Sequence, residues 1–135
     1  MDLKEMIISV SGAKAVRSNV FIAVYETRDT FLESELLLRE LNVDSRGQAS
    51  AISLHLKSGM YAVAIFQDLN NNNILDKNML GIPTEPYGFT NYEGLQLAPP
   101  TWNKTSFYLD SDREIVIDLK WFLARIFLFS AKNIF

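Results

Sequence analysis

Short runs in which apolar and polar side chains alternate constrain the fold of this chain most strongly. Ile52, Leu54 and Leu56 alternate with Ser53 and His55. Successive side chains of a strand point to opposite faces of a sheet, so this period of two predicts a half-buried strand. The same period recurs over residues 20–25 and 114–119.

Further segments extend the predicted sheet. Residues 59–68 are apolar at both alternating positions, which indicates a central strand with both faces covered. Residues 6–10 are a predicted first strand. Residues 30–41 fit both helical and strand spacing. We expect a short turn or helical piece over 30–35 that leads into a strand over 37–43.

The remaining middle of the chain, residues 68–105, is rich in Asn, Gly and Pro and is predicted to be a long ordered loop region. Short strands without a βαβ rhythm predict an all-β fold, an antiparallel β-sandwich of about seven strands. The chain has 135 residues, of which 48% are apolar, enough for one core. We expect one domain over residues 1–120 and an apolar C-terminal extension over 121–135.

Composition excludes several classes of function. The chain has no Cys and a single His, His55, which excludes disulfides, thiolate metal sites and multi-His metal sites. The net charge is −3 and the basic residues are scattered, so nucleic acid is not an expected partner. No apolar stretch approaches the ~20 residues of a transmembrane span. The N-terminus has no signal-peptide pattern. We therefore expect either a cytoplasmic protein or an extracytoplasmic one whose signal was removed.

The segment Asp68–Asp76 (DLNNNNILD) has the donor pattern of a calcium loop. Asp68, Asn70, Asn72 and Asp76 occupy loop positions one, three, five and nine, and Ile74 at position seven can offer its backbone carbonyl. Calcium binds six to eight oxygens, and a tight turn brings alternate residues around one centre. The sequence therefore predicts a calcium site formed by these five residues.

The loop also departs from an EF-hand. Asn73 stands where an EF-hand has Gly, and Met79 stands where it has a bidentate Glu. With two carboxylates we expect weak binding, with a Kd of about 10⁻⁴ to 10⁻³ M. Water or a further carboxylate would complete the shell, and Glu85 is the nearest in sequence. Ile74 and Leu75 are expected to anchor the loop to the core. The alternative is an Asn-rich turn held by its own hydrogen bonds without an ion.

The central part of the chain resembles a known bacterial family. The resemblance rests on the run Gly59-Met60-Tyr61-Ala62-Val63-Ala64-Ile65-Phe66-Gln67-Asp68, then Asn70, Asn72, Leu75-Asp76, Leu80-Gly81-Ile82-Pro83, Glu85-Pro86-Tyr87-Gly88-Phe89 and Asn91. On these residues the chain is similar to the domain of unknown function 2141 (DUF2141) family over about residues 6–120. The resemblance implies an exported bacterial protein with a transthyretin-like (prealbumin-like) β-sandwich, and it implies no known enzymatic activity. Relative to the family, we expect this chain to differ by having no signal peptide at its N-terminus, unless one was removed, and by extending beyond Lys120.

Residues 81–91 (GIPTEPYGFTN) are predicted to be irregular, because two Pro and two Gly interrupt regular pairing. A weak prediction places Glu85, Tyr87, Phe89 and Trp102, together with Tyr92, on a ligand surface for a sugar or a peptide. The favoured alternative is that these aromatic residues pack against the sandwich and brace the ion loop.

Together these patterns favour a non-enzymatic extracytoplasmic module, in the periplasm or at the cell surface, that binds an unknown protein or a cell-surface glycan. One alternative is a hydrolase of cell-surface carbohydrate that uses Asp76, Glu85 or His55 as acid or base. Another is a purely structural scaffold without metal. Residues 121–135 would form a large apolar patch if unpacked. We expect them either to fold against the sandwich or to mediate self-association or another contact.

Overall fold

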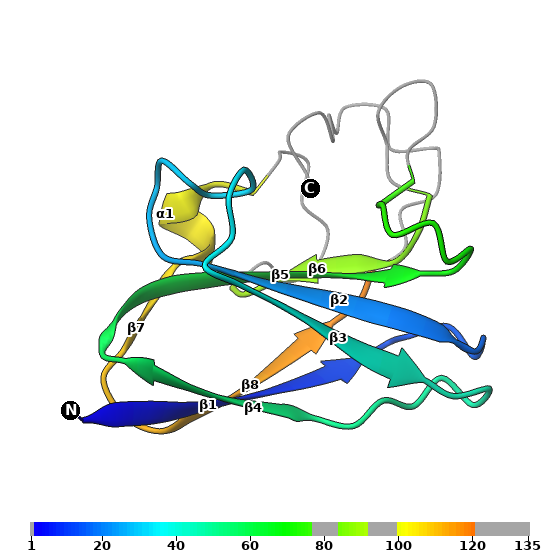
Figure 1. Cartoon of the computed structure of the whole chain (residues 1–135), viewed down its shortest axis with the longest axis horizontal. Coiled ribbons are helices and arrows are strands. Elements are labelled where there is room, and N and C mark those ends of the chain that lie inside the picture. Colours follow the sequence, from blue (N-terminus) through cyan, green and yellow to red (C-terminus); the bar gives the residue numbers. More distant parts are fainter. Residues whose placement is uncertain (1, 77–83, 92–99, 121–135) are drawn as a thin grey trace.

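The computed structural model describes residues 2–76, 84–91 and 100–120 and shows a two-layered β-sandwich (Figure 1). Within these residues there are eight strands and one short helix. Their bounds are β1 (Leu3–Ser11), β2 (Ser18–Tyr25), β3 (Leu37–Val43), β4 (Ile52–Lys57), β5 (Gly59–Asp68), β6 (Tyr87–Phe89), α1 (Trp102–Thr105), β7 (Phe107–Leu109) and β8 (Arg113–Asp118). The predicted all-β sandwich is confirmed. No helix in these residues could cross a membrane.

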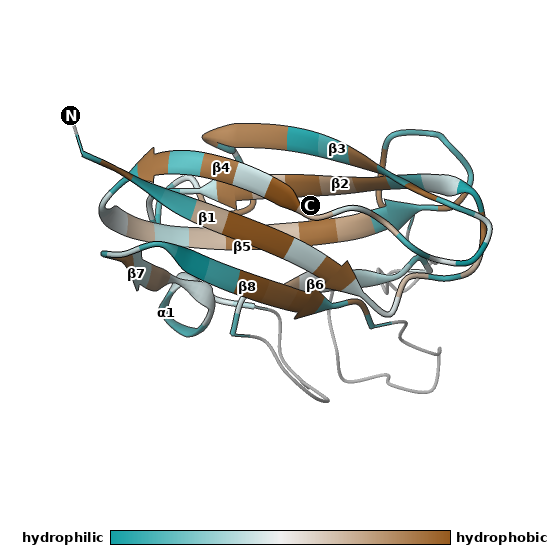
Figure 2. Ribbon diagram, turned by 90° about the horizontal axis from the view of Figure 1, so that it is seen from below, coloured by the Kyte–Doolittle hydropathy of each residue, from teal (hydrophilic) through white to brown (hydrophobic). Residues whose placement is uncertain are grey.

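The strands form a three-stranded and a five-stranded sheet. The first has the order β4-β1-β8, and the second has the order β3-β2-β5-β6, with β7 also paired to β5. The two sheets face each other, and apolar residues occupy β2 and the second halves of β1 and β8 (Figure 2). The interior between the sheets is filled by side chains such as Ile8, Ile22, Leu54, Ile65 and Ile117, all at most 5% exposed.

Most of the predicted strands are confirmed. β5 is central, between β2 and β6, and every residue from Tyr61 to Asp68 is buried. In β4, Leu54 and Leu56 point inward while Ser53 and His55 are exposed. β3 begins at Leu37, directly after a segment of turns, as the sequence predicts.

Two predictions about the strands are wrong. β1 and β8 pair in parallel, with Ile8 opposite Ile115. Alternation specifies the buried face of a strand but not its direction, so it could not distinguish this pair from an antiparallel one. In the segment predicted to be irregular, Tyr87–Phe89 form β6, which pairs antiparallel with β5.

The outer face of the five-stranded sheet carries a second apolar cluster. We call it the outer cluster; it consists of Ala23, Tyr25, Ala64, Phe66, Leu75, Tyr87 and Phe89, all buried. Phe31, Leu32 and Trp102 from neighbouring segments pack against it. β5 is therefore covered on both faces, which explains why its sequence is apolar at both alternating positions.

Candidate functional site

The predicted ion loop follows β5 directly and curls back on itself. Asp68, the last residue of β5, is fully buried, and its carboxylate accepts hydrogen bonds from two backbone N–H groups. Asn72 N–H donates to Oδ1 at 3.3 Å, and Asn73 N–H donates to Oδ2 at 2.8 Å. Asn71 and Asn73 have φ of 58° and 65°. Asn adopts this left-handed conformation more readily than most residues, so the Asn-rich sequence suits the tight turn.

The side chains of the loop converge on Asp76. Asn72 Nδ2 donates to Asp76 Oδ1 at 2.7 Å, and Asn70 Nδ2 donates to the other oxygen, Oδ2. Asn72 Oδ1 in turn accepts a hydrogen bond from Ile74 N–H at 3.2 Å. The structure thus brings together three of the predicted side-chain ligands, while Asp68 fixes the turn that carries them.

Glu85 closes the base of the loop. Its Oε2 accepts a hydrogen bond from Leu69 N–H at 2.6 Å, and its Oε1 accepts one from Asp76 N–H at 2.9 Å. The side chain is 3% exposed, and burial raises the pKa of Glu85 above its ordinary value. The two N–H donors oppose this shift, and the charges of Asp76 and Asp68 add to it. Spacing suggested Glu85 only as an extra ligand; its role as a brace between the two ends of the loop was not recognisable from sequence.

The two apolar residues near the end of the loop differ in burial. Leu75 is 7% exposed and belongs to the outer cluster, as predicted. Ile74 is 60% exposed, so the prediction that it anchors the loop is wrong. Asn73, with a φ of 65°, precedes the two residues, of which Ile74 is exposed and Leu75 is buried. The use of the Ile74 carbonyl as a ligand stays a prediction. Met79, Tyr92 and residues 121–135 lie outside the described residues.

The donor set fits a hard, oxygen-seeking cation. Rotating an Asn amide by 180° exchanges its nitrogen and oxygen. The amide oxygens of Asn70 and Asn72 would then face the carboxylate of Asp76, an arrangement that becomes favourable with a cation between them. Among the described residues, no three or more His, Asp or Glu side chains are grouped to hold a metal. A site here therefore depends on amides as well as on carboxylates.

The aromatic residues of the weakly predicted ligand surface are mostly packed. Tyr87 and Phe89 are 1% and 3% exposed, and their rings meet edge to face at 5.8 Å. Trp102, at the start of α1, is half-buried, and its ring lies 6.0 Å from that of Phe31. This is the packing that we gave as the alternative. Ligand binding by these residues stays a prediction.

His55 lies on the other sheet, away from the loop. On the outer face of the β1–β4 pair it stands opposite Glu5, with 3.9 Å between His55 Nε2 and Glu5 Oε2. Ser53 Oγ donates to the same Glu5 oxygen at 2.7 Å. The sequence gave no acidic partner for His55, because the partner comes from cross-strand register. The structure does not bring His55 together with Asp76 or Glu85.

One of the comparisons with known proteins gives a match. The model of a family described as "Uncharacterized protein conserved in bacteria (DUF2141)" matches residues 8–117. No curated protein and no solved structure matches the chain. The matched region includes the whole loop and Glu85, whereas the transthyretin-like type of the sandwich stays a prediction.

Proposed function

We propose that this chain, which belongs to the DUF2141 family of uncharacterized bacterial proteins, is a non-enzymatic binding module that acts outside the cytoplasm and carries a calcium-stabilised loop over residues 68–76. The observation that carries the proposal is the convergence of the Asn70 and Asn72 side chains on the carboxylate of Asp76. The ion would replace these contacts with oxygen ligands from the same residues.

The chemistry of the donors favours calcium. Carboxylate and amide oxygens are hard ligands, and calcium accepts the irregular geometry that a flexible loop provides, whereas magnesium demands a near-ideal octahedron. The loop supplies only two carboxylates, Asp68 and Asp76, so affinity should be weak. Weak sites of this kind are typical of extracellular modules, where calcium is abundant. This supports a location in the periplasm or at the cell surface.

The position of the loop suits a binding module. Asn73, Ile74, Leu75 and Asp76 line one side of a hollow of about 910 Å³ on the outer face of the five-stranded sheet. An ion that orders the loop would also fix this side of the hollow. In this proposal the module presents the exposed side of the loop, where Ile74 is 60% exposed, to a protein or a cell-surface glycan.

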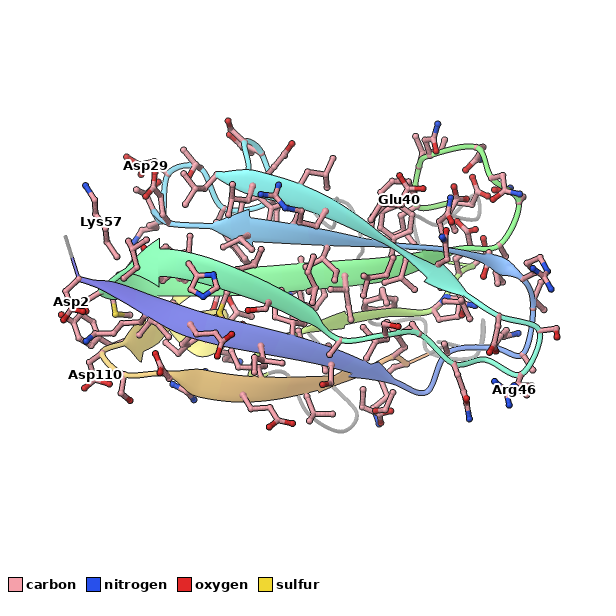
Figure 3. All side chains as sticks on the ribbon, turned by 60° about the horizontal axis from the view of Figure 1, so that its bottom comes forward. Asp2, Asp29, Glu40, Arg46, Lys57 and Asp110 are labelled. Atoms are coloured by element: carbon pink, nitrogen blue, oxygen red, sulfur yellow. The ribbon has the colours of Figure 1, made fainter. Side chains whose placement is uncertain are left out.

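The test is thermal unfolding in about 10 mM calcium, ten times the upper end of the expected Kd, and in chelator. A ligand at ten times its Kd stabilises the folded state by about 1.4 kcal/mol, so the melting temperature should rise by several degrees. In the Asp76→Asn variant this rise should disappear. Asp110→Asn is the matched control, because it removes one charge from an exposed residue between β7 and β8 (Figure 3) and should keep the calcium effect. Identical melting curves of the unsubstituted chain with calcium and with chelator would refute the ion.

Identical melting curves with calcium and with chelator are what the scaffold alternative predicts. In that alternative the hydrogen bonds within the loop hold its conformation without an ion. For the hydrolase alternative we find no supporting observation among the described residues. Both oxygens of Glu85 accept backbone hydrogen bonds, and His55 lies on the other sheet. A non-enzymatic role is therefore the function that the geometry supports best.

A further inference from the structure

The hollow beside the loop combines an apolar floor with an acidic rim. Its floor includes Phe21, Tyr25 and Phe66, and Leu38 of β3 borders it. The outer face of a sandwich sheet commonly faces water and is polar. Phe31, Leu32 and Leu75 already cover part of this face. Beside the hollow, however, Phe21 is only half-buried and Leu38 is 50% exposed, so a further apolar segment can pack there.

The charges around the hollow have one sign. Glu33, Glu35, Glu40 and Asp76 line it, and no Lys or Arg is among the described residues that do so. Glu40 extends from β3 on the side of the loop that follows β5 (Figure 3). Such a rim favours an occupant that is apolar and positively charged.

Residues 121–135 have this chemistry. Eleven of these fifteen residues are apolar, and Arg125 and Lys132 are their only charged side chains. They lie outside the described residues, but the residue before them is placed. Lys120 N–H donates to Tyr87 O at 2.8 Å, and Tyr87 N–H donates to Lys120 O at 2.9 Å. The chain therefore enters this segment from Lys120, beside edge strand β6 of the five-stranded sheet, whose Tyr87 belongs to the outer cluster.

We propose that residues 121–135 of the same chain bind in this hollow and cover the outer face of the five-stranded sheet. Length permits it: fifteen residues span about 22 Å even as a helix, and about 50 Å when extended. The floor from Phe21 to Tyr25 on β2 extends over about 13 Å. Covalent attachment also gives the segment an effective concentration in the millimolar range, which favours it over a separate partner of equal affinity.

This proposal goes beyond the proposed calcium loop and does not depend on it. Glu33, Glu35 and Glu40 lie outside the loop, so the rim stays acidic whether or not Asp76 binds an ion. The two tests below also use no calcium, so their failure is distinguishable from failure of the ion proposal.

The first test is site-directed cross-linking in the full chain, which contains no Cys. Glu40→Cys with Ser130→Cys places one thiol at the rim and one in the segment. The matched control, Glu114→Cys with Ser130→Cys, places the first thiol on exposed β8 of the opposite sheet. A short bismaleimide and peptide mass spectrometry give the intramolecular yield. We expect a yield several-fold higher from position 40, although position 114 is nearer to 130 in sequence.

The second test exchanges charges. Glu33→Lys with Glu35→Lys should lower the cross-linking yield from position 40, and adding Arg125→Glu with Lys132→Glu should restore it. Yields that are equal from positions 40 and 114, or higher from 114, would overturn the proposal. So would a cross-link from position 40 that joins two copies of the chain, because the occupant would then be a second molecule.

Discussion

Two buried carboxylates, Asp68 and Glu85, hold the loop through backbone N–H groups rather than through basic side chains. Each accepts two such hydrogen bonds, and together they fix the turn and join its two ends. Hydrogen bonds to a charged acceptor are stronger than neutral ones, so these residues order the loop backbone. That backbone positions Asn70, Asn72 and Asp76 for the contacts on which the calcium proposal depends.

The raised pKa of Glu85 predicts a pH effect on stability. Because its pKa in the folded state lies above the ordinary value of 4.5, the folded protein binds more protons than the unfolded chain between the two values. The free energy of unfolding should therefore fall as pH rises from about 4.5 through the folded pKa, and this contribution should then level off. The measurement is urea unfolding in chelator across pH 4–8. Comparing the unsubstituted chain with Glu85→Gln isolates the contribution of Glu85 to the free energy of unfolding.

Two other acids, Asp44 and Asp118, have pKa values shifted in the opposite direction. The pKa of Asp44 is lowered chiefly by backbone hydrogen bonds from Gln48 and Arg46, and that of Asp118 by hydrogen bonds from Lys120 and Ser11. Their contributions to stability are present above pH 3.8 and are lost as pH falls through their lowered pKa values. A difference curve between the unsubstituted chain and Glu85→Gln that stays flat or rises from pH 4.5 would contradict the prediction.

At the scale of elements, β6 shows how closely the two sheets approach. A Cβ at Gly88 would lie 2.8 Å from Ile117 Cγ2 and 3.2 Å from Asp118 O, both of β8. Gly88→Ala should therefore destabilise the protein by about 1–3 kcal/mol, since overpacking forces neighbouring atoms to shift. Urea unfolding measures this change.

Gly59→Ala is the matched control, because its new Cβ would lie 3.7 Å from the ring of Tyr61, an ordinary contact. Its effect should be small or slightly stabilising. Combining Gly88→Ala with Ile117→Ala should cost less than the sum of the two single changes, because Ala at position 117 lacks the Cγ2 atom. If Gly88→Ala and Gly59→Ala lowered the free energy of unfolding equally, the close approach of Gly88 to β8 would not be the cause of the destabilisation.

These elements also show what sequence could predict. Alternation identified β2, β4 and β8, and apolar residues on both faces identified β5. These strands could be predicted because the positions that a strand buries are apolar and are therefore visible in the sequence. β6 was missed because Pro86 and Gly88 read as loop signals, whereas Gly88 is the residue that fits against Ile117. The parallel β1–β8 pair was missed because strand direction depends on chain connections and not on local pattern.

The candidate site, like the fold, could be predicted only in part from the sequence. Spacing identified the loop residues whose side chains converge, since alternate positions of a tight turn point to one centre. The bracing by Glu85 was missed because it depends on how residues 84–86 pack beside the end of β5, sixteen residues from Leu69. Likewise, the contact of His55 with Glu5 follows from the β1–β4 register, which joins residues about fifty positions apart.

At the scale of the whole molecule, β2 and β5 connect the two apolar clusters. Ile65 faces the interior between the sheets, while its neighbour Phe66 belongs to the outer cluster. A change on either face should therefore weaken the same structure, and we predict one cooperative unfolding transition. Ile65→Ala and Phe66→Leu should each lower its midpoint, Ile65→Ala by more, since Leu/Ile→Ala changes in cores cost about 2–5 kcal/mol.

Two probes can check this cooperativity. Far-UV circular dichroism reports both sheets, and fluorescence of Trp102, measured in a Trp121→Phe background, reports packing beside the outer cluster. The two midpoints should coincide in urea and should shift together in each variant. Val116→Ala, on the exposed face of β8 at 62% exposure, is the control and should change neither by more than about 0.5 kcal/mol. If Phe66→Leu moved only the Trp102 transition, the outer cluster would unfold separately, and the sandwich would not be a single cooperative unit.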